Sequence, residues 1–221
     1  MGHHGRVDAV LSVLYVVVLV TAGMAGAGLL RARPPAPPRR APVATMVALV
    51  LTAVPSLLQL TVAPGLFAAL RRDRAAIGDG QLWRLVTSFA VQDSGWPGLI
   101  FNLAALAVIG TLAERLWGPA RWVCVALAVQ VLGNLWGLVV QPVGAGTSLV
   151  NYGLAASLAA AALVLGASRP PAVVSLAFAL VLLALGDIHG GAALLGGLFG
   201  GLFAALDAGT GRKSGGGTPV S

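Results

Sequence analysis

The chain has 221 residues, of which 57% are hydrophobic and only 10% are charged, and its mean hydropathy is +0.90. A soluble domain carries about 25% charged residues, so this composition excludes a soluble globular or disordered protein and indicates a polytopic membrane protein. The net charge of +7 does not favour nucleic-acid binding, because the basic residues are spread between apolar runs and form no single patch.

Apolar runs of roughly transmembrane length follow one another along the chain. A helix needs about 20 apolar residues to cross a bilayer, and the runs cover 9–30, 43–70, 98–117, 120–140, 148–166, 171–186 and 188–206. We therefore expect an all-α polytopic fold with one span for each run. Pro55 and Pro64 predict a kink or an early end in the second run. The first run could instead be a signal peptide, but it is long for that role and lacks a clean cleavage site, which favours a retained helix.

These runs predict a division of the chain into three parts. Residues 1–42 hold the first transmembrane helix and a linker rich in proline and arginine, 43–207 form the main membrane domain, and 208–221 form a flexible tail. The single cysteine, Cys124, excludes an intrachain disulfide and a multi-cysteine metal site. It lies in an apolar run, so we expect a buried, inert thiol.

The basic residues between the runs predict the orientation in the membrane. Alternate loops fall on two sides, and the side with the excess of Lys and Arg faces the cytoplasm. That side carries Arg31, Arg33, Arg39, Arg40, Arg115, Arg121, Arg169, Arg212 and Lys213, and the other carries Arg6, Arg71, Arg72, Arg74 and Arg84. The N-terminus and the 71–97 segment are therefore expected outside, and the C-terminus inside. Trp83, Trp96, Trp117 and Trp122 lie near the predicted span ends and are expected to be interfacial anchors.

Few polar side chains lie at membrane depth, and such groups are candidates for function. Ser148 opens the fifth run, His189 the seventh, and Asn102 lies early in the third. All three runs cross in the same direction, so a hydroxyl, an imidazole and an amide share one depth near the outer face. These groups can serve as a serine nucleophile, a general base and an oxyanion donor.

Each of these residues also has a purely structural interpretation. A lone serine can bond a backbone carbonyl, a lone histidine can pack or relay protons, and an asparagine can join two helices. Asp187 is most simply the N-cap of the last helix, and its spacing from His189 does not favour a role in a triad. Gly146 gives the backbone just before Ser148 greater conformational freedom. Glycines after His189 allow close helix approach.

Taken together, these motifs resemble the rhomboid family of intramembrane serine proteases over roughly residues 43–206. The resembling segments are GQLWRL with Trp83 and Arg84, GTLAERLWG with Gly110, Glu114 and Gly118, Gly146-Thr147-Ser148 with Tyr152 four residues on, and His189 followed by Gly191 and Gly196. The resemblance implies a six-helix core preceded by one extra helix, a Ser148–His189 dyad, and an oxyanion held by the Ser148 N–H and the Asn102 side chain. It implies that Tyr152 stacks on the histidine, that Gly146, Gly191 and Gly196 support the site, and that the Trp83–Arg84 and Gly110–Glu114–Gly118 motifs are structural.

The resemblance further implies an endopeptidase that cuts transmembrane helices near the outer face, with no cofactor and no metal. The expected partners are membrane-protein substrates and the lipid bilayer, and the expected location is the plasma membrane of a bacterium; oligomeric state is left open. Two departures from the family pattern are Gly98, where a histidine is common, and Leu149, where glycine is usual. They favour an alternative, an inactive relative that binds membrane helices without cutting them. A transporter that relays protons through His189 is a third possibility, but no internal repeat supports it.

Overall fold

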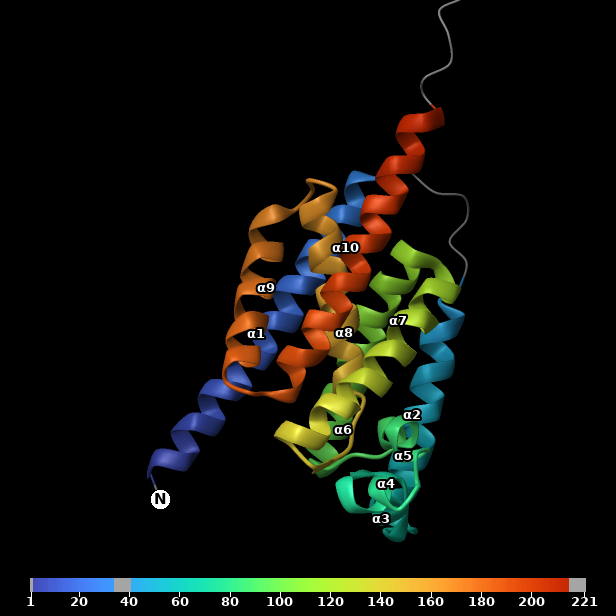
Figure 1. The fold of residues 1–221 in the computed structure, drawn as a ribbon, viewed down its shortest axis with the longest axis vertical. Coiled ribbons are helices and arrows are strands. Elements are labelled where there is room, and N and C mark those ends of the chain that lie inside the picture. Colours follow the sequence, from blue (N-terminus) through green and yellow to red (C-terminus); the bar gives the residue numbers. More distant parts are fainter. Residues whose placement is uncertain (1, 34–40, 215–221) are drawn as a thin grey trace, which may run out of the picture.

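The structure is a computed structural model that describes residues 2–33 and 41–214. Helices dominate it (Figure 1). In chain order the elements are α1 (Gly2–Ala32), α2 (Val43–Thr61), α3 (Gly65–Leu70), β1 (Arg72–Asp73), α4 (Arg74–Gly78), α5 (Arg84–Thr87), η1 (Ser88–Ala90), α6 (Gly95–Ala105), the π-helical turn η2 (Leu106–Gly110), α7 (Thr111–Val140), β2 (Val143–Gly144), α8 (Ser148–Val164), α9 (Arg169–Ala184) and α10 (Ile188–Ser214). The two short strands pair antiparallel, with Arg72 opposite Gly144.

Apolar helices of spanning length confirm the membrane character of the chain. Among the described residues, four helical stretches are long and apolar enough to cross a bilayer, namely Val10–Ala32, Val43–Thr61, Gly95–Val140 and Ile188–Gly209. Two shorter apolar helices cover Ser148–Val164 and Arg169–Ala184.

The longest stretch, Gly95–Val140, is not one straight helix. Gly118 adopts φ 76°, ψ 167°, a conformation that glycine tolerates and other residues rarely adopt. Trp122 Nε1 donates to the Gly110 carbonyl at 3.0 Å, although residues twelve apart in a straight helix lie about 18 Å apart. The chain therefore reverses at Gly118, between the predicted runs 98–117 and 120–140.

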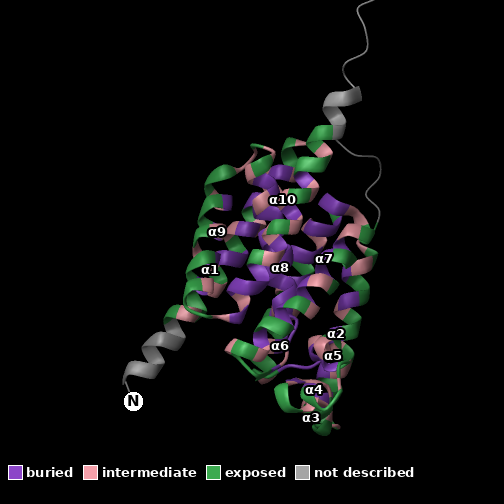
Figure 2. Cartoon of the chain, viewed as in Figure 1, coloured by how far each residue is buried: buried purple, intermediate pink, exposed green. Residues whose placement is uncertain are grey.

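Helix α8 forms the centre of the bundle. It is buried on most of its surface and lies between α7, α9, α10 and α1 (Figures 1 and 2). Its tightest neighbour is α10, because a Cβ on Gly196 would overlap the Gly153 carbonyl and a Cβ on Gly200 would overlap the backbone of Ser157. Glycines thus let the two backbones touch, as close helix packing in lipid requires.

Helix α1, which precedes the predicted main membrane domain, is part of the packed bundle. It packs mainly against α9 and α8, while α2 lies at the opposite edge of the molecule against α6 and α7 (Figure 1). Ser175 Oγ of α9 donates to the Val18 carbonyl of α1 at 3.0 Å. These contacts fix α1 beside the helix that begins with Ser148.

Several local predictions need correction. Trp117 and Trp122 are not interfacial, because both are buried beside the Gly118 reversal and their indole N–H groups bond to protein oxygens. Cys124 is exposed on the surface of α7 and is not buried. The early end predicted for the second run is confirmed, since helix α2 continues through Pro55 and ends at Thr61, before Pro64. Helix α10 continues to Ser214, beyond the predicted end of the last span; most of the 31–40 linker and residues 215–221 lie outside the described residues.

Candidate active site

Ser148 is the first residue of α8, where the chain enters the bundle from a tight loop. Gly146 precedes it with φ +135°, and its N–H donates to the Ser88 carbonyl at 2.8 Å, which anchors the loop. The first N–H groups of a helix lack partners within that helix and face a favourable dipole for negative charge. The backbone at Ser148 is therefore suited to stabilise an oxyanion.

The predicted site residues converge on one cavity of about 290 Å³. Asn102 from α6, Ser148 and Tyr152 from α8, and His189 from α10 all line it. Gly146, Gly98 and Leu149 line it as well, and so does Tyr15 from α1. Segments that are distant in the sequence thus place a hydroxyl, an amide and an imidazole around one space.

The His189 ring is held on three sides. Its Nδ1 lies 2.7 Å from Asp187 Oδ1, and its centroid lies 4.7 Å from the ring of Tyr152 and 4.7 Å from the ring of Tyr15. An ionised carboxylate only accepts hydrogen bonds, so this contact assigns the proton of a neutral imidazole to Nδ1. Nε2 is then the nitrogen with a lone pair for a serine proton.

Asp187 lies in the short link between α9 and α10, and both of its carboxylate oxygens accept hydrogen bonds. Oδ1 also accepts the His189 backbone N–H at 2.8 Å, and Oδ2 accepts the Tyr15 hydroxyl at 2.5 Å. Burial raises the pKa of the Asp187 carboxyl, but the bonds from His189 and Tyr15 outweigh it and hold the pKa below its usual range. The sequence prediction of an N-cap agrees with this geometry, and the same carboxylate also contacts the imidazole.

Ser148 and His189 face the same cavity without a direct hydrogen bond between Ser148 Oγ and the imidazole, as far as the described residues show. Catalytic hydrogen bonds are often long in ligand-free enzymes and tighten when substrate binds. The arrangement therefore places a hydroxyl and an imidazole at one cavity, with no hydrogen bond between them.

The Asn102 amide is oriented by a residue that sequence reasoning missed. Its Nδ2 donates to Gln92 Oε1 at 2.8 Å, which leaves its second N–H as a further donor. Gln92 is itself tied to α2, since its N–H and its carbonyl oxygen bond the side-chain amide of Gln59 at 2.8 and 2.7 Å. No sequence motif marks Gln92, because it lies in a loop whose partners come from another helix.

The two departures from the family pattern have different consequences. Gly98 lines the cavity, and the nearest atom to a Cβ there would be the side chain of Ser94 at 2.6 Å. Leu149 is buried, and its side chain packs beside Gly133 of α7. A Cβ added to Gly133 would lie 3.4 Å from Leu149 Cδ1. Leu149 thus has a packing site of its own on α7.

Arg72 is a second residue that the sequence did not single out. It is only 3% exposed and lines the cavity, where it donates to Asn134 Oδ1 at 2.6 Å and to the Gln141 carbonyl at 2.8 Å. Burial lowers its pKa to about 10, with nearby Asp93 acting in the opposite direction. The guanidinium is therefore charged at neutral pH and braces the loop before Ser148.

The remaining motif residues lie outside the cavity. Arg84 is buried and donates to the Ala68 and Arg71 carbonyls at 2.8 and 2.9 Å, while its neighbour Trp83 is exposed. Glu114 accepts the backbone N–H groups of Ala44 and Thr45 at 2.9 and 2.7 Å. Its carboxylate therefore caps the start of α2, where the first N–H groups need partners.

Gly110, Gly118, Gly191 and Gly196 each lie at a turn or a close contact. A Cβ on Gly110 would press on Thr45, and a Cβ on Gly191 would press on the Trp136 ring. Among the side chains of residues 10–33 and 41–209, no cluster of His, Cys, Asp and Glu is suited to bind a metal ion.

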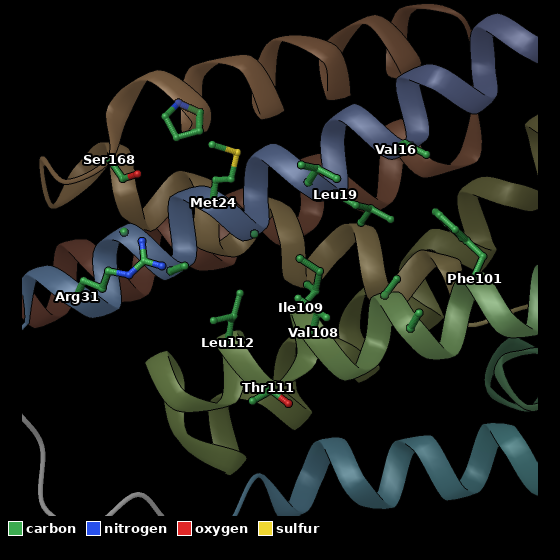
Figure 3. Close-up of a pocket in the computed structure, with 17 residues that line it drawn as sticks. Val16, Leu19, Met24, Arg31, Phe101, Val108, Ile109, Thr111, Leu112 and Ser168 are labelled. Carbon is green, nitrogen blue, oxygen red and sulfur yellow. The ribbon is translucent and has the colours of Figure 1, made fainter.

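A larger groove of about 850 Å³ lies between α1 and the α6–η2–α7 segment (Figure 3). Its lining is almost entirely apolar and includes the exposed side chains of Val20, Met24 and Val108. Arg31 and Ser168 lie at one end, and Val16 and Phe101 lie toward the other (Figure 3). Phe101 lines both this groove and the cavity of Ser148, so the two spaces adjoin.

Comparison with known proteins gives consistent matches. The family model described as Rhomboid domain matches residues 79–209. The chain is 29% identical over 143 residues to rhomboid protease GluP of Bacillus subtilis (strain 168), a match covering 61% of this chain and 27% of GluP. It is 30% identical over 81 residues to the rhomboid relative YdcA of the same organism, covering 35% of this chain and 40% of YdcA. Each match thus covers less than half the length of the relative.

Proposed function

The chain belongs to the rhomboid family, since the matched domain spans more than half of it, and on this premise we propose that it is an intramembrane serine endopeptidase. The observation that supports this proposal best is the single cavity lined by Ser148, His189 and Asn102. Each group comes from a different helix, and together they provide the parts that acyl transfer requires.

The proposed reaction proceeds through an acyl-enzyme. Ser148 Oγ attacks the carbonyl carbon of a peptide bond while its proton passes to His189 Nε2, and the carbonyl oxygen becomes an oxyanion. The Ser148 N–H and the Asn102 side chain stabilise that oxyanion. Collapse breaks the C–N bond, and the leaving amine takes the proton from Nε2. Water then attacks the ester, gives a proton to Nε2, and releases the acid as the proton returns to Ser148.

The proposed substrate is a transmembrane helix of another membrane protein. The groove between α1 and η2 offers apolar side chains at membrane depth, and it adjoins the catalytic cavity at Phe101. A helix lying there with one face in the groove would bring its nearer end to Ser148. The segment that is cut must unwind, because an intact helix keeps its carbonyls in hydrogen bonds. The proposed orientation places the catalytic cavity near the outer face and the C-terminus in the cytoplasm.

We expect Asn102→Ala to lower kcat about 10²- to 10³-fold with little change in KM, because the amide acts on the oxyanion and not on the bound peptide. The measurement is cleavage of a single-span reporter protein in proteoliposomes. Asn151→Ala is a less suitable comparison, because Asn151 Nδ2 bonds the Asn102 carbonyl at 3.1 Å. Gln59→Glu is also unsuitable, because a carboxylate cannot donate the hydrogen bond that the Gln59 amide gives to the Gln92 carbonyl. The control is therefore Thr61→Ala, which removes an exposed hydroxyl from α2. A fall in affinity with unchanged kcat would contradict the oxyanion role.

A non-cleaving helix-binding protein is the alternative, and the unformed bond between Ser148 and His189 is the observation that favours it. The reporter experiment separates the two functions. Cleavage near one end of the reporter span, mapped by mass spectrometry, supports the protease. Co-purification of an intact reporter with the folded wild-type protein supports the binder.

A further inference from the structure

The catalytic base is surrounded by groups that the Ser148–His189 pair does not use. Asp187 bonds His189 Nδ1 at 2.7 Å, and Tyr15 bonds the other oxygen of the same carboxylate at 2.5 Å. Tyr15 lies on α1, outside residues 79–209 of the matched domain, and 172 residues before Asp187. A helix added before the family domain therefore reaches the active site.

We propose that Tyr15 and Asp187 are positioning residues for His189, so that the helix α1 completes the active site. The chain of contacts runs from the Tyr15 hydroxyl through both oxygens of Asp187 to Nδ1 of the imidazole. This inference rests on the proposed function, because it assigns the groups that prepare His189 for its role as base.

The contacts of Asp187, Tyr15 and Tyr152 with one another and with His189 have different effects on the imidazole. The carboxylate fixes the Nδ1–H tautomer and thereby directs the Nε2 lone pair into the cavity. It also faces the positive charge that the imidazole gains when it takes the serine proton. The Tyr15 hydroxyl orients the carboxylate, and the Tyr15 and Tyr152 rings limit rotation of the imidazole from two sides, each with its centroid 4.7 Å away.

The burial of this cluster supports a role beyond that of a surface cap. The side chains of His189 and Asp187 are only 17% and 14% exposed. Asp187 also caps α10 through the His189 N–H at 2.8 Å, and this task alone could be done by asparagine or serine, which are equally good N-caps. Substitutions that keep the cap but change the charge can therefore separate the two roles.

The test compares the rate of labelling by a fluorophosphonate probe, and kcat and KM for the reporter, in five full-length proteins. These are the wild type, Asp187→Asn, Asp187→Ser, Tyr15→Phe and the double variant Tyr15→Phe/Asp187→Asn. We expect both Asp187 variants to lose about 10²- to 10⁴-fold in kcat with KM nearly unchanged, and Tyr15→Phe to lose roughly tenfold. In the double variant the tyrosine change should have no further effect, because its partner charge is gone.

Two control variants remove similar groups elsewhere. Asp207→Asn removes a carboxylate from the far end of α10, where it pairs with Arg121, and Thr21→Val removes a hydroxyl from α1 that bonds only the helix backbone. Both are expected to label at the wild-type rate.

A readout independent of catalysis completes the test. The chain has three histidines, so replacing His3 and His4 by glutamine leaves His189 as the single imidazole for ¹⁵N NMR. We expect a protonated Nδ1 in the neutral ring, and loss of that preference in Asp187→Ser, whose short hydroxyl keeps the cap but no longer supplies the carboxylate to Nδ1. Wild-type rates in Asp187→Asn, or an Nε2-protonated ring in the parent, would overturn the inference. An unlabelled but folded wild type would contradict the proposed function instead, and the NMR spectrum would still decide the Asp187 contact.

Discussion

Ser148→Ala is expected to abolish cleavage of a transmembrane reporter, with a fall in rate of at least about 10³-fold. The hydroxyl is the proposed nucleophile, and Ser148 both lines the cavity and begins α8. Stability should change by less than about 1 kcal/mol, because the substitution removes one oxygen at the edge of a cavity and creates no large void. The measurement is reporter cleavage in proteoliposomes, alongside thermal unfolding in detergent.

Ser157→Ala is the matched control for this variant. Ser157 lies nine residues further along α8, where its hydroxyl accepts the Trp117 indole N–H at 3.1 Å and donates to the Leu154 carbonyl at 2.7 Å. We expect it to lower stability by about 1–3 kcal/mol, because the buried indole N–H loses its partner, while cleavage by the folded protein persists. Equal loss of cleavage in both variants would indicate that Ser148 acts through packing and not through chemistry.

Gly196→Ala is expected to destabilise the protein by about 3 kcal/mol, because the added Cβ overlaps the backbone carbonyl of Gly153. Backbone atoms cannot rotate away as a flexible side chain can, so α8 and α10 must separate. Since α8 begins with Ser148 and α10 carries His189 in its first turn, the same separation should also lower activity. Thermal unfolding of the detergent-solubilised protein measures the first effect.

The control is Gly201→Ala on the same helix, where no atom lies within 4 Å of the new Cβ. Alanine favours helix over glycine by about 1 kcal/mol, so this variant should be as stable as the wild type or slightly more stable. Similar destabilisation by both substitutions would show that helix propensity, and not the contact with Gly153, determines the outcome.

The convergence of the proposed site residues could be predicted from the sequence, because topology and motif order constrain their positions strongly. Ser148, His189 and Asn102 each lie at the start of a run that crosses in one direction, and the structure brings them to one cavity. The ring of Tyr152 lies against His189 as the resemblance implied. The limits of α8 and α9 agree with the predicted runs to within two residues, because hydropathy marks the ends of apolar runs, whereas α2 ends earlier and α10 continues further than predicted.

The contacts that could not be predicted from the sequence join distant segments that share no motif or periodicity. Tyr15 reaches Asp187 across 172 residues, and nothing in an apolar helix distinguishes a tyrosine that faces the active site. Gln92 orients Asn102 from a loop that is held by α2. The sequence predicts a simple N-cap at Asp187, yet its Oδ1 contacts both the backbone N–H and the ring of His189.

The central claim is that Ser148 is a nucleophile activated by His189, and labelling with a fluorophosphonate probe tests it without knowledge of the substrate. The purified wild type, Ser148→Ala and His189→Ala would be incubated with the probe side by side, with folding verified by thermal unfolding. We predict labelling of the wild type alone. A folded wild type that takes no label, or equal labelling of Ser148→Ala, would contradict the claim.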